Sequence, residues 1–314
     1  MSCNLTENKI QVFNPTNGEN IKEIPITSEN EFLQIISASK NEKQKWNESS
    51  PNERKKIIKK FRKAIVQNMD LFIETICNET GKKPFEGMLE VYTSVEHMNH
   101  TEKLLTKIFK KKPRSVGTLL TKKAWTELQP MGIAGIISPW NYPLILTLTP
   151  VIEALAGGNV VVLKPSEQTP LTSELLKKIW DEATGKPNIL QIVYGGGKIG
   201  NMLVNTPEVD IVCFTGSTKI GKLIAIDCAK NLKPVILELG GKDPMIVCDD
   251  AEILRAVNAS VWGGMSNAGQ TCISVERIFV AENIKDIFIE KITQKINVLS
   301  AGDSIHSQVG SISV

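Results

Sequence analysis

Two short apolar runs, IAGIIS at residues 133–138 and VVVL at residues 160–163, decide how this sequence folds. Neither run alternates apolar with polar residues, and such unbroken apolar strands are typical of parallel sheets that helices cover on both faces. A helical stretch separates the two runs, which gives the β–α–β rhythm of an α/β fold. We therefore predict a doubly wound parallel sheet built around these strands.

The same alternation of β-rich runs and helical stretches continues along the chain. The further runs are residues 189–194, 211–215, 235–237, 245–248 and 278–280. Ahead of the first strand the sequence is helical, because Ser50-Pro51-Asn52-Glu53 is a capping box with proline at the first helical position and apolar residues follow at helical spacing. Further helices are expected over residues 71–80, near 91–105 and over 284–299.

The segment from Ser115 to Leu128 differs from its surroundings. Its residues alternate loosely between polar and apolar types, and it lies between the helical front and the α/β part of the chain. Alternation of period two favours strands. We predict a hairpin that projects from the molecule.

The composition indicates the class of protein. With 314 residues, 41% of them hydrophobic and 23% charged, the chain can bury more than one core, and two domains are expected. The net charge of +3 is small, and the lysine clusters lack neighbouring stacking aromatic residues, which argues against nucleic-acid binding. No run reaches the roughly 18 apolar residues of a membrane span. The polar start argues against a signal peptide, so a cytoplasmic location is expected.

The six cysteines show no CxxC pairing and no regular spacing. This argues against zinc sites and disulfides, so free thiols and no metal are expected. Cys272 lies in the polar, glycine-containing loop of residues 266–274, whereas Cys213 and Cys248 lie in apolar runs. A thiol in an open polar setting is the better candidate nucleophile.

Other candidate residues follow predicted strands, at the edge where parallel sheets bind ligands. Asn141, between two prolines, could donate a hydrogen bond to a developing oxyanion, although a turn asparagine is the simpler interpretation. Lys164 and Glu167 could contact the ribose or phosphates of a dinucleotide, or be ordinary surface charges. Glu238, beside two glycines, could be a partly buried general base or a paired structural glutamate.

The turn after the run 211–215 combines a strand end, Gly216 and the start of a helix. Free backbone N–H groups and the helix dipole favour phosphate at such a turn. Its spacing, GxxxxG, matches neither the dinucleotide fingerprint nor a complete Walker A motif, so this signal alone is not specific.

Taken in order, these segments resemble the motifs of the aldehyde dehydrogenase superfamily. The likeness extends from about residue 12 to the end of the sequence, and the last two motifs are highly specific. The matching segments are PWN at 139–141, KPSE at 164–167, FTGS at 214–217, ELGGK at 238–242 and GQTC at 269–272.

The resemblance implies a reaction, the NAD(P)-dependent oxidation of an aldehyde to a carboxylic acid. It implies that Cys272 attacks the aldehyde carbonyl to form a thiohemiacetal, while Asn141 and the Cys272 backbone N–H stabilise the oxyanion. Hydride transfer to the nicotinamide leaves a thioester, and Glu238 activates the water that hydrolyses it. The presence of Glu238 favours hydrolysis over transfer to coenzyme A.

The resemblance also implies which residues bind the cofactor. These are Trp140, Lys164, Ser166, Glu167, Gly216, Ser217, Leu239 and Gly240. Because the charge of Glu167 would repel a 2′-phosphate, NAD is favoured over NADP.

By the same resemblance, residues 1–112 and 129–240 form a Rossmann-like dinucleotide-binding domain, residues 113–128 an oligomerisation hairpin, and residues 241–314 the first part of an α/β catalytic domain. Family members continue well past this point, so an incomplete, C-terminally truncated catalytic domain is expected. The homo-oligomers of the full-length family depend on a strand in the absent part, so the resemblance does not extend that expectation to this chain.

Two alternatives remain open. The chain could be a catalytically inactive remnant that binds a cofactor or a partner, although the presence of all five motifs favours an enzyme. A cofactor-independent thiol acyltransferase or esterase would need Cys272 and Asn141 but neither Lys164 nor Glu167. The sequence does not indicate which aldehyde is used, because no charged anchor for a substrate is identifiable in it.

Overall fold

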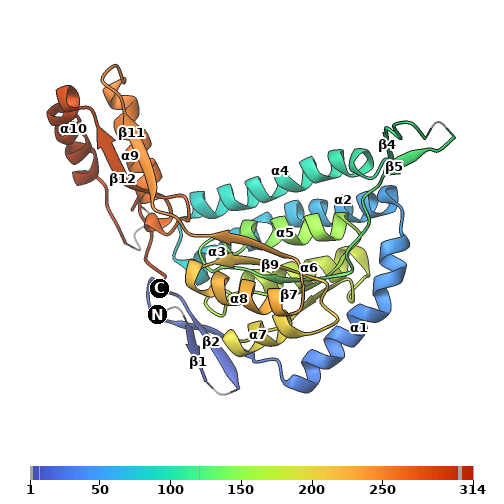
Figure 1. Ribbon diagram of the computed structural model, residues 1–314. Helices are drawn as coiled ribbons and strands as arrows, with labels where there is room; N and C mark the ends of the chain where they lie inside the picture. Colours follow the sequence, from blue (N-terminus) through green and yellow to red (C-terminus); the bar gives the residue numbers. More distant parts are fainter. Residues whose placement is uncertain (1–2, 7, 120, 303–305, 314) are drawn as a thin grey trace.

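A five-stranded parallel sheet forms the centre of the larger part of the molecule (Figure 1). The structure is a computed structural model that describes residues 3–6, 8–119, 121–302 and 306–313. The strand order is β10-β9-β6-β7-β8. The chain runs outward from β6 to β8 and then returns to the other side of β6, so the switch point lies between β6 and β9. The strands are β6 (Ile133–Ile137), β7 (Val160–Lys164), β8 (Leu190–Ile192), β9 (Ile211–Gly216) and β10 (Val235–Leu239).

Helices cover both faces of this sheet, which buries β6 and β7 along their whole length. On one face lie α5 (Ile145–Ala156) and α6 (Leu171–Thr184). On the other lie α1 (Glu29–Glu48), α7 (Gly197–Asn205) and α8 (Thr218–Lys230). The predicted doubly wound α/β fold is therefore confirmed.

Three further helices form a second layer over α5 and α6: α2 (Pro51–Gln67), α3 (Met69–Thr80) and α4 (Pro84–Ile108). The capping box predicted at Ser50 is present, because its side chain accepts from the Glu53 N–H and Glu53 accepts from the Ser50 N–H. Gly81 ends α3 with φ 73°, a left-handed conformation that glycine adopts without strain. Among the described residues, none of the helices combines the length and hydropathy of a membrane-spanning segment.

Two N-terminal features are absent from the sequence-based prediction. One is α1, which begins with a second capping box between Ser28 and Glu31. The other is an antiparallel sheet of β1 (Cys3–Leu5), β2 (Lys9–Phe13) and β3 (Asn20–Pro25). The sheet packs on the main body through a small apolar cluster that includes Ile10 and Leu171.

Two parts project from the main body (Figure 1). One is an exposed antiparallel hairpin of β4 (Lys112–Arg114) and β5 (Ala124–Thr126), which begins earlier than predicted because β4 precedes Ser115. The second part, here called the C-terminal arm, comprises residues 243–297 and has its own small core of Val247, Ala256, Val257 and Phe288. Its elements are β11 (Asp243–Val247), α9 (Ile253–Met265), η1 (Ser266–Gly269), β12 (Val275–Val280), η2 (Glu282–Ile284) and α10 (Lys285–Asn297).

Candidate active site

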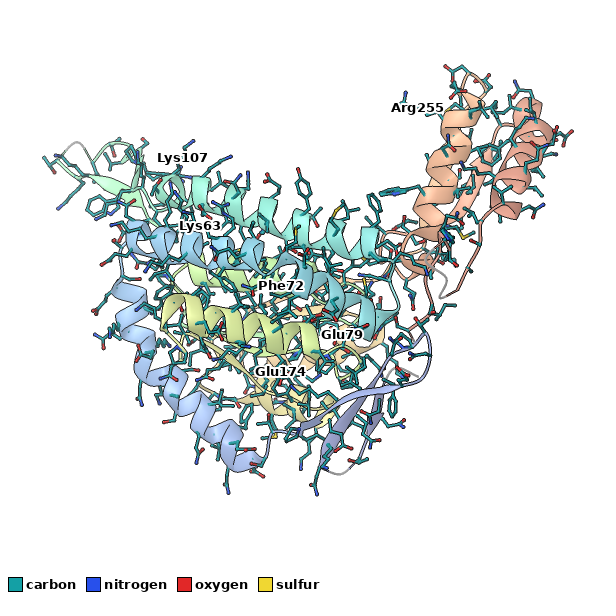
Figure 2. The ribbon with its side chains drawn as sticks, turned by 180° about the vertical axis from the view of Figure 1, so that it is seen from behind. Lys63, Phe72, Glu79, Lys107, Glu174 and Arg255 are labelled. Atoms are coloured by element: carbon teal, nitrogen blue, oxygen red, sulfur yellow. The ribbon has the colours of Figure 1, made fainter. Side chains whose placement is uncertain are left out.

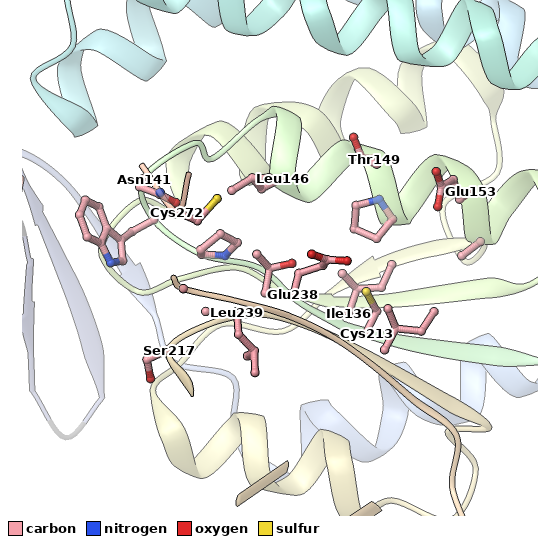
Figure 3. Close-up of a pocket in the computed structure, with 18 of the residues that line it drawn as sticks. Ile136, Asn141, Leu146, Thr149, Glu153, Cys213, Ser217, Glu238, Leu239 and Cys272 are labelled. Carbon is pink, nitrogen blue, oxygen red and sulfur yellow. The ribbon is translucent and has the colours of Figure 1, made fainter. Parts of the chain in front are cut away.

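A cavity of about 820 Å³ opens where the carboxyl ends of β9 and β10 meet α5 and the loop after η1. Cys272, Glu238 and Asn141 all line it (Figure 3). They come from three separate parts of the chain: the loop between α9 and β12, the strand β10, and the turn between β6 and α5. The structure therefore places the three predicted catalytic residues around one space.

Side-chain amides join the Cys272 loop to the turn after β6. Asn141 Nδ2 donates to the carbonyl oxygen of Gln270 at 2.8 Å. In the opposite direction, Asn267 Nδ2 donates to the carbonyl oxygen of Asn141 at 3.0 Å. Because an amide nitrogen carries two hydrogens, Asn141 keeps one that can be donated toward an oxyanion.

The loop ahead of Cys272 has an unusual backbone. Asn267, Ala268 and Gly269 have φ values of 52°, 54° and 77°, in the left-handed region that residues with a Cβ adopt at some cost. The Asn267 N–H donates to Glu86 Oε1 on α4 at 2.6 Å. Contacts of this kind hold a conformation that the local sequence does not favour.

The cysteines differ in exposure, and all six are free. Cys272 is exposed, in agreement with its polar surroundings. Cys213 on β9 is half-buried, and its burial, together with the nearby carboxylates of Glu153 and Glu238, raises its pKa to about 11. Cys248 lies just past the end of β11 and is exposed, so its apolar run does not bury it as expected. Among the described residues, no group of three or more His, Cys, Asp or Glu side chains is arranged to hold a metal.

The expectation that Glu238 is partly buried is wrong. Glu238 lies within β10, not after it, and it is exposed on the side of the strand that lines the cavity. The physical reason is that β10 is an edge strand of the sheet, and α8 covers its other face.

A buried ion pair supports the turn after β6. Lys82 Nζ lies 2.5 Å from Glu90 Oε2, and both side chains are 0% exposed. The other oxygen of Glu90 accepts hydrogen bonds from the backbone N–H groups of Leu144, at 2.8 Å, and Ile145, at 3.2 Å. A carboxylate at this position stabilises the positive end of the α5 dipole. Glu90 thereby fixes the start of the helix that follows Asn141.

The same lysine is linked to the loop that carries Cys272 through an aromatic ring. Lys82 Nζ lies 3.8 Å from the centroid of the Tyr142 ring, a cation–π contact. The Tyr142 hydroxyl and Thr271 Oγ1 are 2.9 Å apart, and burial raises the pKa of this tyrosine. No local sequence pattern marks Lys82, Glu90 or Tyr142 as part of the site, because their contacts join α4 and α5 to a loop that is distant in sequence.

A second cavity of about 590 Å³ adjoins the first. The two share a wall of five residues: Pro139, Trp140, Thr215, Gly216 and Ser217. Six of the eight residues predicted to bind the cofactor line the second cavity: Trp140, Lys164, Ser166, Glu167, Gly216 and Ser217. The other two, Leu239 and Gly240, line the first cavity together with Trp140, Gly216 and Ser217.

The chemistry of the second cavity fits a dinucleotide. Lys164 Nζ lies 3.0 Å from Glu167 Oε2, so a cation and a carboxylate stand together at the end of β7. The first turn of α8, capped by Ser217, presents backbone N–H groups of the kind that bind phosphate. Ile220 and Leu223 on the same helix expose apolar surface that suits a base.

Comparison with known proteins agrees with this geometry. The model of the aldehyde dehydrogenase family matches residues 3–313. D-glyceraldehyde dehydrogenase (NADP(+)) of Picrophilus torridus is 33% identical over 96% of this chain and 61% of its own length. Betaine aldehyde dehydrogenase of Vibrio vulnificus is 30% identical over 98% of this chain and 63% of its own length.

Solved structures show the same fold. An aldehyde dehydrogenase from Brucella melitensis biovar abortus is 30% identical, with a TM-score of 0.94 over 98% of this chain and 64% of that one. A Bacillus cereus aldehyde dehydrogenase, solved as an NAD+ complex, is 28% identical, with a TM-score of 0.93 over 98% of this chain and 63% of that one. This chain spans about 61% of the length of the first curated relative. It belongs to the aldehyde dehydrogenase family.

Proposed function

We propose that this protein oxidises an aldehyde to a carboxylic acid with a nicotinamide cofactor as hydride acceptor. The observation that carries the proposal is the pair of adjoining cavities. One holds the thiol of Cys272 beside Asn141 and Glu238, and the other is suited to a dinucleotide. The wall that they share would bring the reactive end of the cofactor to the thiol.

The first step is nucleophilic attack. The thiolate of Cys272 forms a bond to the carbonyl carbon, and the electron pair of the C=O bond moves to the oxygen. Asn141 Nδ2, with its remaining hydrogen, and the Cys272 backbone N–H would stabilise that oxygen. The nicotinamide supplies a hydride acceptor, so loss of hydride from this thiohemiacetal leaves a thioester on Cys272.

The second step is hydrolysis. Glu238, exposed to the same cavity, would accept a proton from a water molecule as its oxygen attacks the thioester carbon. The tetrahedral adduct then expels the Cys272 thiolate and releases the carboxylic acid. A carboxylate open to water suits this role, since both the reacting water and the released proton need a path to solvent.

We propose NAD as the cofactor, although the Picrophilus relative is named for NADP(+). Glu167 stands beside Lys164 at the strand end where ribose hydroxyls bind, and its charge disfavours a 2′-phosphate. Glu167→Gln should therefore shift the ratio of kcat/KM for NAD to that for NADP toward NADP by about tenfold, the effect of one close charge near the surface. An unchanged ratio would show that the Glu167 carboxylate does not determine the preference for NAD over NADP.

The proposal is tested by following NADH or NADPH absorbance with a panel of aldehydes on the 314-residue chain. Cys272→Ala should abolish turnover while calorimetry shows unchanged binding of NAD. A rate that survives in this variant would contradict the assignment of the nucleophile.

Two other outcomes would favour the alternative functions. Cofactor binding without turnover of any aldehyde would favour a binding protein. Hydrolysis of p-nitrophenyl acetate that needs Cys272 but neither cofactor nor Lys164 would favour a thiol esterase.

We also propose the division of the chain into a dinucleotide-binding domain (residues 1–112 and 129–240), a hairpin (113–128) and part of a catalytic domain (241–314). The separate cores of the main body and the C-terminal arm support this division. The exposed strands of the hairpin support a role in contact between subunits. The six free cysteines support a reducing, cytoplasmic setting.

A further inference from the structure

One face of α5 forms a wall of the Cys272 cavity. Leu146, Thr149, Pro150 and Glu153 line it, and their spacing of three, four and seven residues places them on one side of the helix. Figure 3 shows Leu146 near Cys272 and Glu153 toward the opposite end of the pocket. Seven residues of helix span about 10 Å. Leu146 and Glu153 therefore lie about 10 Å apart along α5, and the cavity that they line reaches from the Cys272 end of this helix face to the Glu153 carboxylate.

The charges around this cavity have one sign. Glu153 and Glu238 line it, and within the described part of the chain no lysine, arginine or histidine does. The remaining lining is mostly apolar, from residues such as Ile136, Leu146 and Ile236. A cavity of this kind attracts cations and repels anions, since apolar walls strengthen the field of the charges inside them.

Glu153 is available to a ligand. Its side chain is 60% exposed. Among the described residues it forms an ion pair with His97, whose Nε2 lies 3.2 Å from Glu153 Oε1. The geometry of this contact is not that of a hydrogen bond. Burial is the main cause of the raised pKa of Cys213 on the cavity floor, and the charges of Glu153 and Glu238 raise this pKa further. The field of Glu153 thus acts within the cavity, and no role in the chemical steps above explains it.

We propose that Glu153 selects aldehydes that carry a cationic group at the end opposite the carbonyl. The inference rests on the proposed function and adds the class of substrate. The carbonyl would lie at Cys272, the alkyl chain along the apolar face of α5, and the cation within ion-pair distance of Glu153. A chain of three methylene groups followed by a quaternary ammonium would carry the cation away from the carbonyl and toward Glu153. Aldehydes that end in a carboxylate would be poor substrates.

The first test compares a charged aldehyde with its neutral isostere. The pair is 4-trimethylammoniobutanal and 5,5-dimethylhexanal, which differ in one atom, nitrogen or carbon. The ratio of their kcat/KM values should favour the cation, and Glu153→Gln should lower that ratio by about fivefold, the effect of one ion pair at a partly exposed site. Succinic semialdehyde should be the poorest substrate and should improve in the same variant.

The matched control is Glu182→Gln. This residue lies on α6, outside the cavity, and its side chain is 61% exposed, so the substitution removes the same charge from an equally exposed position. The control separates the local field from a change in net charge. An equal loss of preference in both variants would contradict the proposal.

A second measurement needs no turnover. Methanethiosulfonates with a trimethylammonioethyl or a sulfonatoethyl group convert a thiol to a mixed disulfide and release methanesulfinate. Their rates at Cys272 can be followed by peptide mass spectrometry, with exposed Cys248 on the C-terminal arm as the internal reference. Glu153→Gln should lower the ratio of cationic to anionic rates about threefold at Cys272 and leave it unchanged at Cys248.

The two measurements separate the inference from the proposed function. Turnover of the neutral aldehyde with no preference for its cationic isostere would overturn the inference alone. Absence of turnover with every aldehyde would contradict the proposed function, and a bias of the thiol reagents that depends on Glu153 would still support a cation-selective cavity. Equal thiol rates in wild type and Glu153→Gln would overturn that selectivity.

Discussion

Glu238 projects from an edge strand into the cavity that also holds Cys272. In the proposed mechanism Glu238 acts after hydride transfer, because the proton that it would accept comes from the water that hydrolyses the thioester. Removal of its charge should therefore slow one step and leave the other. The two steps can be separated in time.

Glu238→Gln should give a burst of about one reduced cofactor for each active site, followed by a steady rate lowered about 100-fold or more, the usual contribution of a general base. Rapid mixing with absorbance detection measures both phases. A variant that loses the burst together with the steady rate would place Glu238 before hydride transfer, contrary to the mechanism proposed here.

A single site residue can be predicted from the sequence when it belongs to a local pattern. Cys272 is a candidate nucleophile because its polar loop is visible in the sequence itself, whereas the strand end alone favours a turn asparagine at Asn141, whose catalytic role is what the family resemblance implies. Glu153 is not predicted, since only the path of α5 along the cavity shows that this glutamate lines the same cavity as the Cys272 thiol. The sequence shows no charged residue that could bind the far end of a substrate, whereas the structure leads to the proposal that Glu153 does so.

The first turns of α4 connect parts of the molecule that are distant in sequence. Glu86 accepts from the Asn267 N–H of the loop that carries Cys272, and Glu90 accepts from the first N–H groups of α5. The same helix therefore contacts both this loop and the helix that follows Asn141. Lys82 supplies the charge that makes a fully buried Glu90 tolerable.

Lys82→Met should lower the free energy of unfolding by about 3–5 kcal/mol, because it leaves Glu90 buried without a cation. The double variant Lys82→Met/Glu90→Gln should recover part of this loss. Urea unfolding measures both. If the double variant is no more stable than the single one, an uncompensated charge is not the cause of the loss.

Glu79 joins α3 to α6 and makes the stability depend on pH. The side chain, drawn in Figure 2, is fully buried, and it accepts hydrogen bonds from the backbone N–H groups of Leu171, at 2.8 Å, and Thr172, at 3.0 Å. Burial raises its pKa from 4.5 to about 7, although these hydrogen bonds oppose the shift. Between these values the folded chain holds a proton that the unfolded chain has released.

The contribution of this proton to stability is therefore complete below pH 4.5 and is lost as the pH rises through 7. Glu79→Gln should flatten the dependence of the unfolding free energy on pH in this window, by up to about 3 kcal/mol. Chemical unfolding at a series of pH values measures the slope. A variant with the wild-type slope would assign the pH dependence to other groups.

Elements with strong local signals are predicted well. The capping box at Ser50 and the glycine at Gly81 place the start of α2 and the end of α3. The capping box at Ser28 is as complete as the one at Ser50. The helix that it starts could still not be predicted, because it is rich in lysine and glutamate and its buried face is narrow. The short strands β1 to β3 could not be predicted, because antiparallel pairing, not an apolar pattern, defines them.

The whole molecule has two cores of unequal size. The main body buries a large continuous apolar cluster, whereas the apolar core cluster of the C-terminal arm has four buried members among the described residues. The stability of a unit rises with the apolar area that it buries. The arm should therefore open more readily than the sheet of the main body.

Hydrogen exchange followed by mass spectrometry should show this order. Amides of α9 and α10 should exchange through openings of lower free energy than those of β6 and β7. Val257→Ala should speed exchange in the arm and leave the rates in β6 unchanged. Uniform protection across both units would indicate that they unfold as one.

The loop that carries Cys272 joins the C-terminal arm to the main body, because Asn267 donates to the carbonyl oxygen of Asn141 and Asn141 donates to that of Gln270. The arm behaves mechanically as a lever, and points close to a fulcrum move least. Thermal rocking that carries α10 through a wide arc would shift the thiol only slightly. Cys272 can therefore keep its place beside the second cavity even when the outer part of the arm moves.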